Sequence, residues 1–330
     1  MKNRRRFLRG GLVALFAGPS WTFAQGPGKV HRVGYLSARA THAAVDDAFV
    51  QGMRELGYTV GRNLVIDYRW AGNDLNRLQQ LADELVRLDV DVIVTATTAG
   101  TRAAMRATPT IPIVMAASAD PVAAGLVASL SRPGGNVTGL SLQTTDIARK
   151  RLQLLREIVP GAMTIALLAE RVGDPAQGTT AILVAETRAV AGQVSVGLVV
   201  REIARPDELA DAFAQFRRER AQALIVQVSP LLIEHRQTIV EMAARERLPA
   251  MYEARNFVDD GGFVSYGPDL RETYRRAASY VDRIFKGARP GTLPVEQPDR
   301  LALVINLTAA KTLGLAVPQS LLSRADEVIQ

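Results

Sequence analysis

Small polar, aromatic and acidic residues recur in this sequence where apolar runs end. The segments "TATTAGT", "MAASADP", "MYEARN" and "VSYGPD" each follow such a run. If the runs are parallel strands, their carboxyl ends share one edge of a sheet, where open α/β sheets bind ligands. This joint pattern predicts a ligand-binding site, with hydroxyl, aromatic and carboxylate groups as its contacts.

The candidate residues suggest particular kinds of contact. Thr97 and Thr98 begin a predicted helix, whose first N–H groups and dipole suit a carboxylate. Asp120 precedes Pro121 as a helix N-cap does, although its carboxylate could also meet a ligand amine. The rings of Tyr252 and Tyr266 would offer stacking faces to a ligand, and Glu253 would offer one hydrogen-bond acceptor. Each residue alone fits capping or packing at least as well, so only the joint pattern indicates a ligand.

Patterns typical of catalysis or metal binding are missing from the sequence. It has no cysteine, and its three histidines lack the spacing of metal ligands. It contains neither the nucleophile motif GxSxG nor the phosphate-binding motifs GxxxxGK[ST] and GxGxxG. We therefore expect no catalytic residues, no metal and no cofactor; an α/β hydrolase would need a convergent triad.

The amino terminus is strongly basic. Five of the seven excess positive charges of the 330-residue chain lie within residues 1–24, so its basicity does not indicate nucleic-acid binding. The segment "NRRRFLR" resembles a twin-arginine signal, and the apolar run after it is too short to span a bilayer. We expect residues 1–24 to be an export signal cleaved after Ala24, with Sec export or a short amphipathic helix as alternatives, and a periplasmic mature protein.

The rest of the chain alternates β-branched runs with helical segments, which predicts parallel sheets covered on both faces. The segments "VDVIVTA…TIPIVMA" and "AQALIVQ…RLPAMYE" echo each other, which indicates two similar α/β halves. We expect a first lobe of 25–142 plus about 259–287, and a second of 143–258 plus about 288–330. A helix is expected directly after Asp120, and residues 133–142 should turn into the first crossover.

Three long segments carry a resemblance to a known family: "IPIVMAASADPVAAGLVASLSRPGGNVTGLSLQTTD", "MYEARNFVDDGGFVSYGPD" and "LPVEQPDRLALVINLTAAKTLGLAVPQSLLSRADEVI". They resemble the ABC-transporter substrate-binding family related to tryptophan- and tyrosine-binding proteins, over about residues 30–329. The resemblance implies the type I periplasmic-binding-protein architecture, in which two doubly wound, Rossmann-like α/β lobes are joined by a hinge of several crossovers.

The resemblance also implies which residues contact the ligand. To the candidates above it adds Ser37, Ser118, Gln143 and Thr144. One departure concerns "AERVGDP", where many members have Asn-Pro-x-x-Pro. Here Glu170 and Arg171 would bring charge to the cleft wall, so an aromatic amino acid ligand does not follow automatically.

The sequence thus predicts an exported, monomeric solute-binding subunit of an ABC importer. It would bind a small carboxylate-bearing ligand, either an amino acid or an aromatic acid, and deliver it to a membrane permease with its ATPase. Two alternatives stay open: a ligand-sensing protein that serves a receptor, and an α/β hydrolase.

Overall fold

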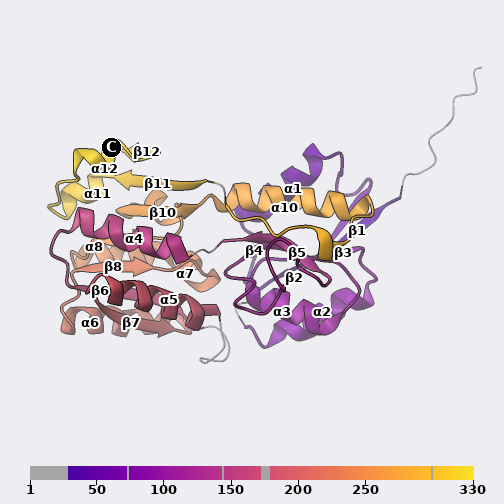
Figure 1. Ribbon diagram of the computed structural model, residues 1–330, viewed down its shortest axis with the longest axis horizontal. Helices are drawn as coiled ribbons and strands as arrows, with labels where there is room; N and C mark the ends of the chain where they lie inside the picture. The colour runs from indigo at the N-terminus through magenta and orange to yellow at the C-terminus, as the bar shows by residue number, and fades with distance from the viewer. Residues whose placement is uncertain (1–28, 73, 143–144, 172–178, 299) are drawn as a thin grey trace, which may run out of the picture.

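The structure is a computed structural model that describes residues 29–330 except 73, 143–144, 172–178 and 299. The side chains of 145–146 and 179–182 also lie outside the description. Two β-sheets, each covered by helices, lie side by side along the long axis of the molecule (Figure 1).

The first sheet is parallel throughout, in the order β2-β1-β3-β4-β5. Its strands are β1 (His31–Ser37), β2 (Leu64–Trp70), β3 (Val92–Thr95), β4 (Ile113–Ser118) and β5 (Val137–Ser141). Four helices cover it: α1 (Ala44–Glu55), α2 (Arg77–Arg87), α3 (Thr98–Ala107) and α10 (Leu270–Phe285). The apolar core against α1 and α10 includes Tyr35 and Phe49, and the core on the opposite face includes Leu36 and Leu85. This sheet with its four helices is the first lobe.

The second sheet has the order β12-β11-β10-β9-β8-β6-β7, and only the β10–β11 pairing is antiparallel. Its strands are β6 (Thr164–Glu170), β7 (Gly197–Ile203), β8 (Ala223–Val226), β9 (Ala250–Tyr252), β10 (Val264–Pro268), β11 (Leu301–Asn306) and β12 (Glu327–Ile329). The flanking helices are α4 (Thr145–Ile158), α5 (Thr179–Gln193), α6 (Leu209–Arg218), α7 (Pro230–Glu234), α8 (Arg236–Arg245), α9 (Asn256–Asp259), α11 (Leu307–Thr312) and α12 (Gln319–Leu322). Together these elements form the second lobe.

The two lobes repeat one topology. The order β7-β6-β8-β9-β10 reproduces β2-β1-β3-β4-β5, with β11 and β12 added beyond β10. Apolar clusters lie on both faces of each sheet, which explains why the strands read as near-continuous apolar runs. The two similar α/β halves predicted from the sequence are confirmed.

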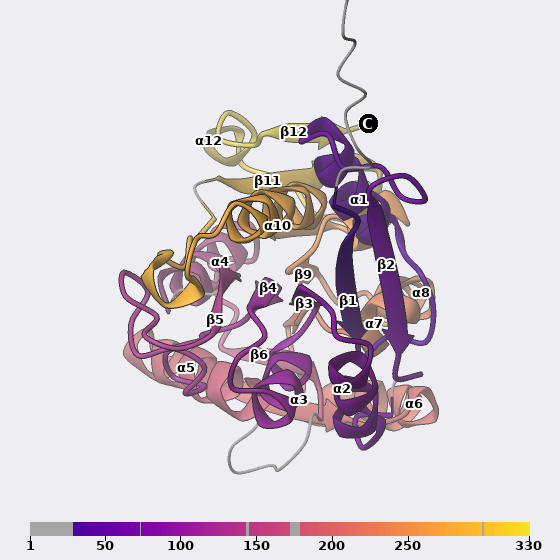
Figure 2. The same cartoon turned by 90° about the vertical axis from the view of Figure 1, so that its right-hand side faces the viewer.

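The chain passes between the lobes at three places: from β5 to α4, from β10 to α10, and from the region of Glu296 to β11. In Figure 2, α10 lies over the first lobe beside α1. The strand β10, within the segment expected in the first lobe, instead pairs with β9 and β11 of the second. Residues after α10 return along the first lobe, where Val295 N donates to Leu130 O at 2.7 Å, before the chain crosses to β11.

The prediction of a helix directly after Asp120 is wrong, because residues 121–125 form turns. The Asp120 carboxylate accepts hydrogen bonds from Val122 N and Ala123 N, both at 2.9 Å, as a cap would. However, Gly125 has φ +67°, a left-handed conformation that reverses the chain. Leu126 and Val127 are then buried in the core beneath the sheet, and the free energy gained by burying them outweighs the helix propensity of the alanines.

Candidate ligand-binding site

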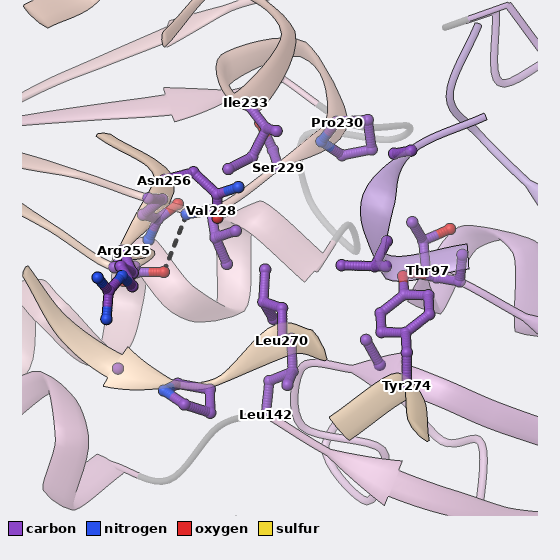
Figure 3. Close-up of a pocket in the computed structure, with 18 of the residues that line it drawn as sticks. Thr97, Leu142, Val228, Ser229, Pro230, Ile233, Arg255, Asn256, Leu270 and Tyr274 are labelled. Atoms are coloured by element: carbon purple, nitrogen blue, oxygen red, sulfur yellow. Dashed lines mark hydrogen bonds between the residues drawn. The ribbon is translucent and has the colours of Figure 1, made fainter. Parts of the chain in front are cut away.

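A cavity of about 620 Å³ lies between the lobes and is lined by residues of both. Its size is within the range of small-molecule sites, roughly 300–1,000 Å³. Thr97 and Tyr274 lie on one side of it, Arg255 and Asn256 on the opposite side, with Leu142 and Leu270 between them (Figure 3). Most of the wall comes from segments that follow the carboxyl ends of strands, as predicted.

The amino terminus of α3 forms part of the first-lobe wall. The Thr97 side chain caps this helix by accepting a hydrogen bond from Gly100 N at 3.1 Å. The buried Thr98 hydroxyl lies 2.9 Å from Ser118 Oγ and accepts the Ala119 N–H at 3.2 Å. These contacts fix the helix start, whose first-turn N–H groups lack intrahelical acceptors and favour an anion.

Arg39 and Tyr274 belong to the same side of the cavity. The Arg39 guanidinium donates to the carboxylate of Asp46, which is fully buried. The Tyr274 hydroxyl donates to Ala96 O at 3.2 Å, directly before the α3 cap. Burial raises the pKa of Tyr274, while the nearby Arg39 charge opposes that rise, so Tyr274 stays protonated at neutral pH.

A buried ion pair supports the second-lobe wall. Glu253, which follows β9 and lines the cavity, accepts a hydrogen bond from Arg151 Nη1 of α4 at 2.5 Å. Its other oxygen accepts the Val228 N–H at 3.0 Å, and Arg151 Nε donates to Tyr266 O at 2.8 Å. Burial lowers the pKa of Arg151, and the Glu253 charge opposes that shift. The pair thus joins α4 to the ends of β8, β9 and β10.

The remaining charged groups of the second-lobe wall also have protein partners. Arg255 pairs with Asp259 at 3.0 Å and with Glu327. Glu170 accepts the Leu231 N–H at 3.1 Å at the start of α7. Burial raises the pKa of Glu170, opposed by hydrogen bonds from Ser229 and Leu231. Arg171, expected to bring charge to the cleft, instead points to Glu202 O and Glu208 and is not among the lining residues.

The predicted site residues that the structure describes divide into three groups. Thr97, Thr98 and Glu253 line the cavity. Ser37 and Ser118 are buried behind the wall: Ser37 Oγ accepts the Arg39 N–H, and Ser118 bonds to Thr98. Three others are not among the lining residues.

Those three have structural surroundings of their own. Asp120 caps the turn described above. Tyr252 stacks on Phe257 in a core cluster of the second lobe, with ring centroids 4.7 Å apart. Tyr266 packs on the cluster at the opposite face of the same sheet. Gln143 and Thr144 lie outside the described residues.

Sequence reasoning missed most of the polar lining residues, among them Arg39, Arg255, Asn256 and Tyr274. Two of them had a local signal, because Arg39 and Arg255 stand in the strand-end segments "YLSARAT" and "MYEARN". Tyr274 had none, because it belongs to a helix that reaches the cavity only through the second crossover.

The described residues contain no cluster of His, Cys, Asp or Glu that could hold a metal ion. Within the same residues, no helix combines the length and apolarity needed to cross a membrane.

Known proteins resemble this chain along most of its length. A "Tyrosine-binding protein" of Clostridioides difficile (strain R20291) is 27% identical over 285 residues, which is 85% of this chain and 80% of that protein. A crystal structure of a conserved domain protein from Vibrio cholerae has a TM-score of 0.84 at 29% identity and covers 91% of this chain and 100% of that one. The ABC domain of Streptococcus pneumonia in complex with L-Trp has a TM-score of 0.82 at 25% identity and covers 91% and 99%. The family model described as "ABC transporter substrate binding protein" matches residues 34–329, and the chain belongs to this family.

Proposed function

We propose that the protein binds a small carboxylate-bearing ligand, either an amino acid or an aromatic acid, in the cavity between its lobes. The observation that carries this proposal is the capped start of α3 in the cavity wall, beside Arg39 and Tyr274. Helix N-terminal N–H groups and a guanidinium both favour an anion. The tyrosine-binding relative and the L-Trp complex support a ligand of this class.

The centre of the cavity suits an apolar body attached to the carboxylate. Leu142 and Leu270 separate the first-lobe wall from the second, with Val228 and Ile233 nearby (Figure 3). A ligand whose carboxylate meets α3 would place its side chain among these residues. Because it contacts both lobes, such a ligand favours the closed arrangement, which a membrane permease would then recognise.

Export, a permease with its ATPase, and a monomeric state are parts of the same proposal. Residues 1–24 have the features of an export signal, and substrate-binding proteins of this family serve ABC transporters. N-terminal sequencing of the exported protein tests cleavage before Gln25, and an intact amino terminus would contradict it. We also propose that the protein has no catalytic activity. This is supported by the family, which is one of substrate-binding proteins.

Thermal unfolding of the mature chain with L-tyrosine, L-tryptophan and benzoate tests the ligand class. A ligand present at about 1,000 times its Kd should stabilise the folded state by about 4 kcal/mol. Sugars and inorganic cations serve as controls. Stabilisation by sugars or cations alone would contradict the proposal.

A further inference from the structure

Arg39 is a charged residue of the cavity wall that the sequence analysis did not select. It lies just beyond the carboxyl end of β1, in the loop that leads to α1. Its side chain is 15% exposed, so the guanidinium has lost most of its hydration while remaining at the cavity. A cation in this position needs polar partners within the protein or from a ligand.

The orientation of the guanidinium is fixed from behind. Asp46 accepts its hydrogen bond, and the same carboxylate accepts Tyr35 OH at 2.6 Å and Ala43 N at 2.7 Å. The Arg39 Cζ atom also lies 5.6 Å from the centre of the Trp70 ring. These contacts restrict the side chain to one direction, and preorganisation of this kind favours binding.

The guanidinium still has an unmet donor. Arg39 Nε is buried and has no hydrogen-bond acceptor among the residues that the structure describes. Buried donors are nearly always paired in folded proteins, so an unpaired one calls for an explanation. Nε itself is buried, so a carboxylate in the cavity would meet the exposed part of the guanidinium and offer it a charge-assisted partner there.

The guanidinium and the α3 amino terminus lie at the same end of the cavity. Tyr274 connects them, because its hydroxyl donates to Ala96 O, next to the Thr97 cap, and the Arg39 charge acts on the same hydroxyl. Arg39, Thr97 and Tyr274 all line the cavity. Two features that attract anions therefore converge on one small region of the wall.

We propose that Arg39 binds the carboxylate of the ligand together with the first turn of α3, and that Asp46 positions it for this role. The inference rests on the proposed function and names the residue that selects an acid over a neutral analogue. It also gives the ligand a direction in the cavity, with its acidic end toward the first lobe.

Calorimetric titration with matched ligands tests the assignment. The probe is whichever of L-tyrosine, L-tryptophan and benzoate stabilises the wild type most, compared with its carboxamide. The wild type should prefer the acid. In Arg39→Gln the affinity for the acid should fall by roughly 10- to 100-fold, the range for lost hydrogen bonds to a charged group, while the amide affinity changes by less than about threefold.

Arg69→Gln is the matched control. Arg69 also lies near the end of a strand of the first sheet and pairs with Glu84 at 2.8 Å, but it is not among the cavity-lining residues. It should leave both affinities unchanged. A purely structural role for Arg39 would lower both affinities alike, and this result, or unchanged affinities in Arg39→Gln, would overturn the inference.

Two further outcomes are informative. If Arg39→Gln does not fold, the same titration is made with Arg39→Lys, because an ammonium lacks the planar fork of a guanidinium. It should reduce the preference for the acid several-fold, and an unchanged preference would overturn the inference. If the wild type responds to none of the three probes, the proposed function itself fails and the inference falls with it.

Discussion

At the scale of single residues, the polar groups of the cavity wall are largely used within the protein. The Thr98 hydroxyl bonds to Ser118, Glu253 pairs with Arg151, and Glu170 holds the start of α7. Such bonds fix side chains before a ligand arrives, which lowers the entropy lost on binding. Burying charged groups in this way costs free energy, and the buried carboxylate of Glu170 is the clearest case.

Glu170 should make the stability of the protein depend on pH. Burial raises its pKa above that of the unfolded chain, so the folded state favours the protonated form. The resulting contribution is complete below the ordinary glutamate pKa and is lost as the pH rises through the raised value. Between about pH 4.3 and neutral, the free energy of unfolding should therefore fall less in Glu170→Gln than in the wild type. Urea unfolding at several pH values measures this.

The control for Glu170 is Glu234→Gln, which replaces an exposed glutamate at the end of α7. Its pH profile should follow that of the wild type. Parallel wild-type and Glu170→Gln profiles would show that Glu170 does not cause the effect.

At the scale of elements, the Arg151–Glu253 pair holds together parts of the second lobe that surround the first two crossovers. Arg151 belongs to α4, which follows the first crossover, and it also donates to Tyr266 of β10, which precedes the second. Close packing reinforces this junction, because a Cβ on Gly267 would lie 2.0 Å from Glu253 O. The ends of β9 and β10 therefore have little freedom to move apart.

Removing one partner of this pair should be more costly than removing both. Arg151→Met leaves the Glu253 carboxylate buried without its cation, and breaking a buried pair in this way costs about 3–5 kcal/mol. The double variant Arg151→Met with Glu253→Met removes both charges and should recover much of that loss. Chemical denaturation of the three proteins measures the free energies of unfolding.

An exposed pair provides the comparison. Arg217→Met breaks the Arg217–Glu246 pair, in which Arg217 is 65% exposed, and should cost at most about 1 kcal/mol. A double variant no more stable than Arg151→Met would contradict the account, because packing rather than unpaired charge would then dominate.

The sequence was most informative where local chemistry decides the structure. Alternating apolar runs predicted both sheets, and Thr97 was recognisable as a helix start. It was least informative about which face of a sheet a side chain takes. In β10, Ser265 and Gly267 line the cavity while Tyr266 packs on the opposite face, because neighbouring residues of a strand alternate. That choice depends on which face meets the other lobe.

At the scale of the whole molecule, two copies of one topology face each other across the cavity, and three crossovers join them. A ligand that contacts both lobes can shift an equilibrium between open and closed arrangements only through its different affinities for the two. Both lobes contribute polar groups to the wall: the start of α3, Arg39 and Tyr274 on the first lobe, and Glu253, Arg255 and Asn256 on the second.

The distance between the lobes, with and without ligand, tests the central claim most directly. The chain has no cysteine, so labels can be attached at Val122→Cys in the first lobe and Gln237→Cys in the second, both exposed positions. Energy transfer between the labels should show a shorter distance at saturating concentrations of the carboxylate probe that binds best. Its carboxamide at the same concentration should have little effect. Saturable binding of the acid with no change in the distance would contradict ligand-driven closure.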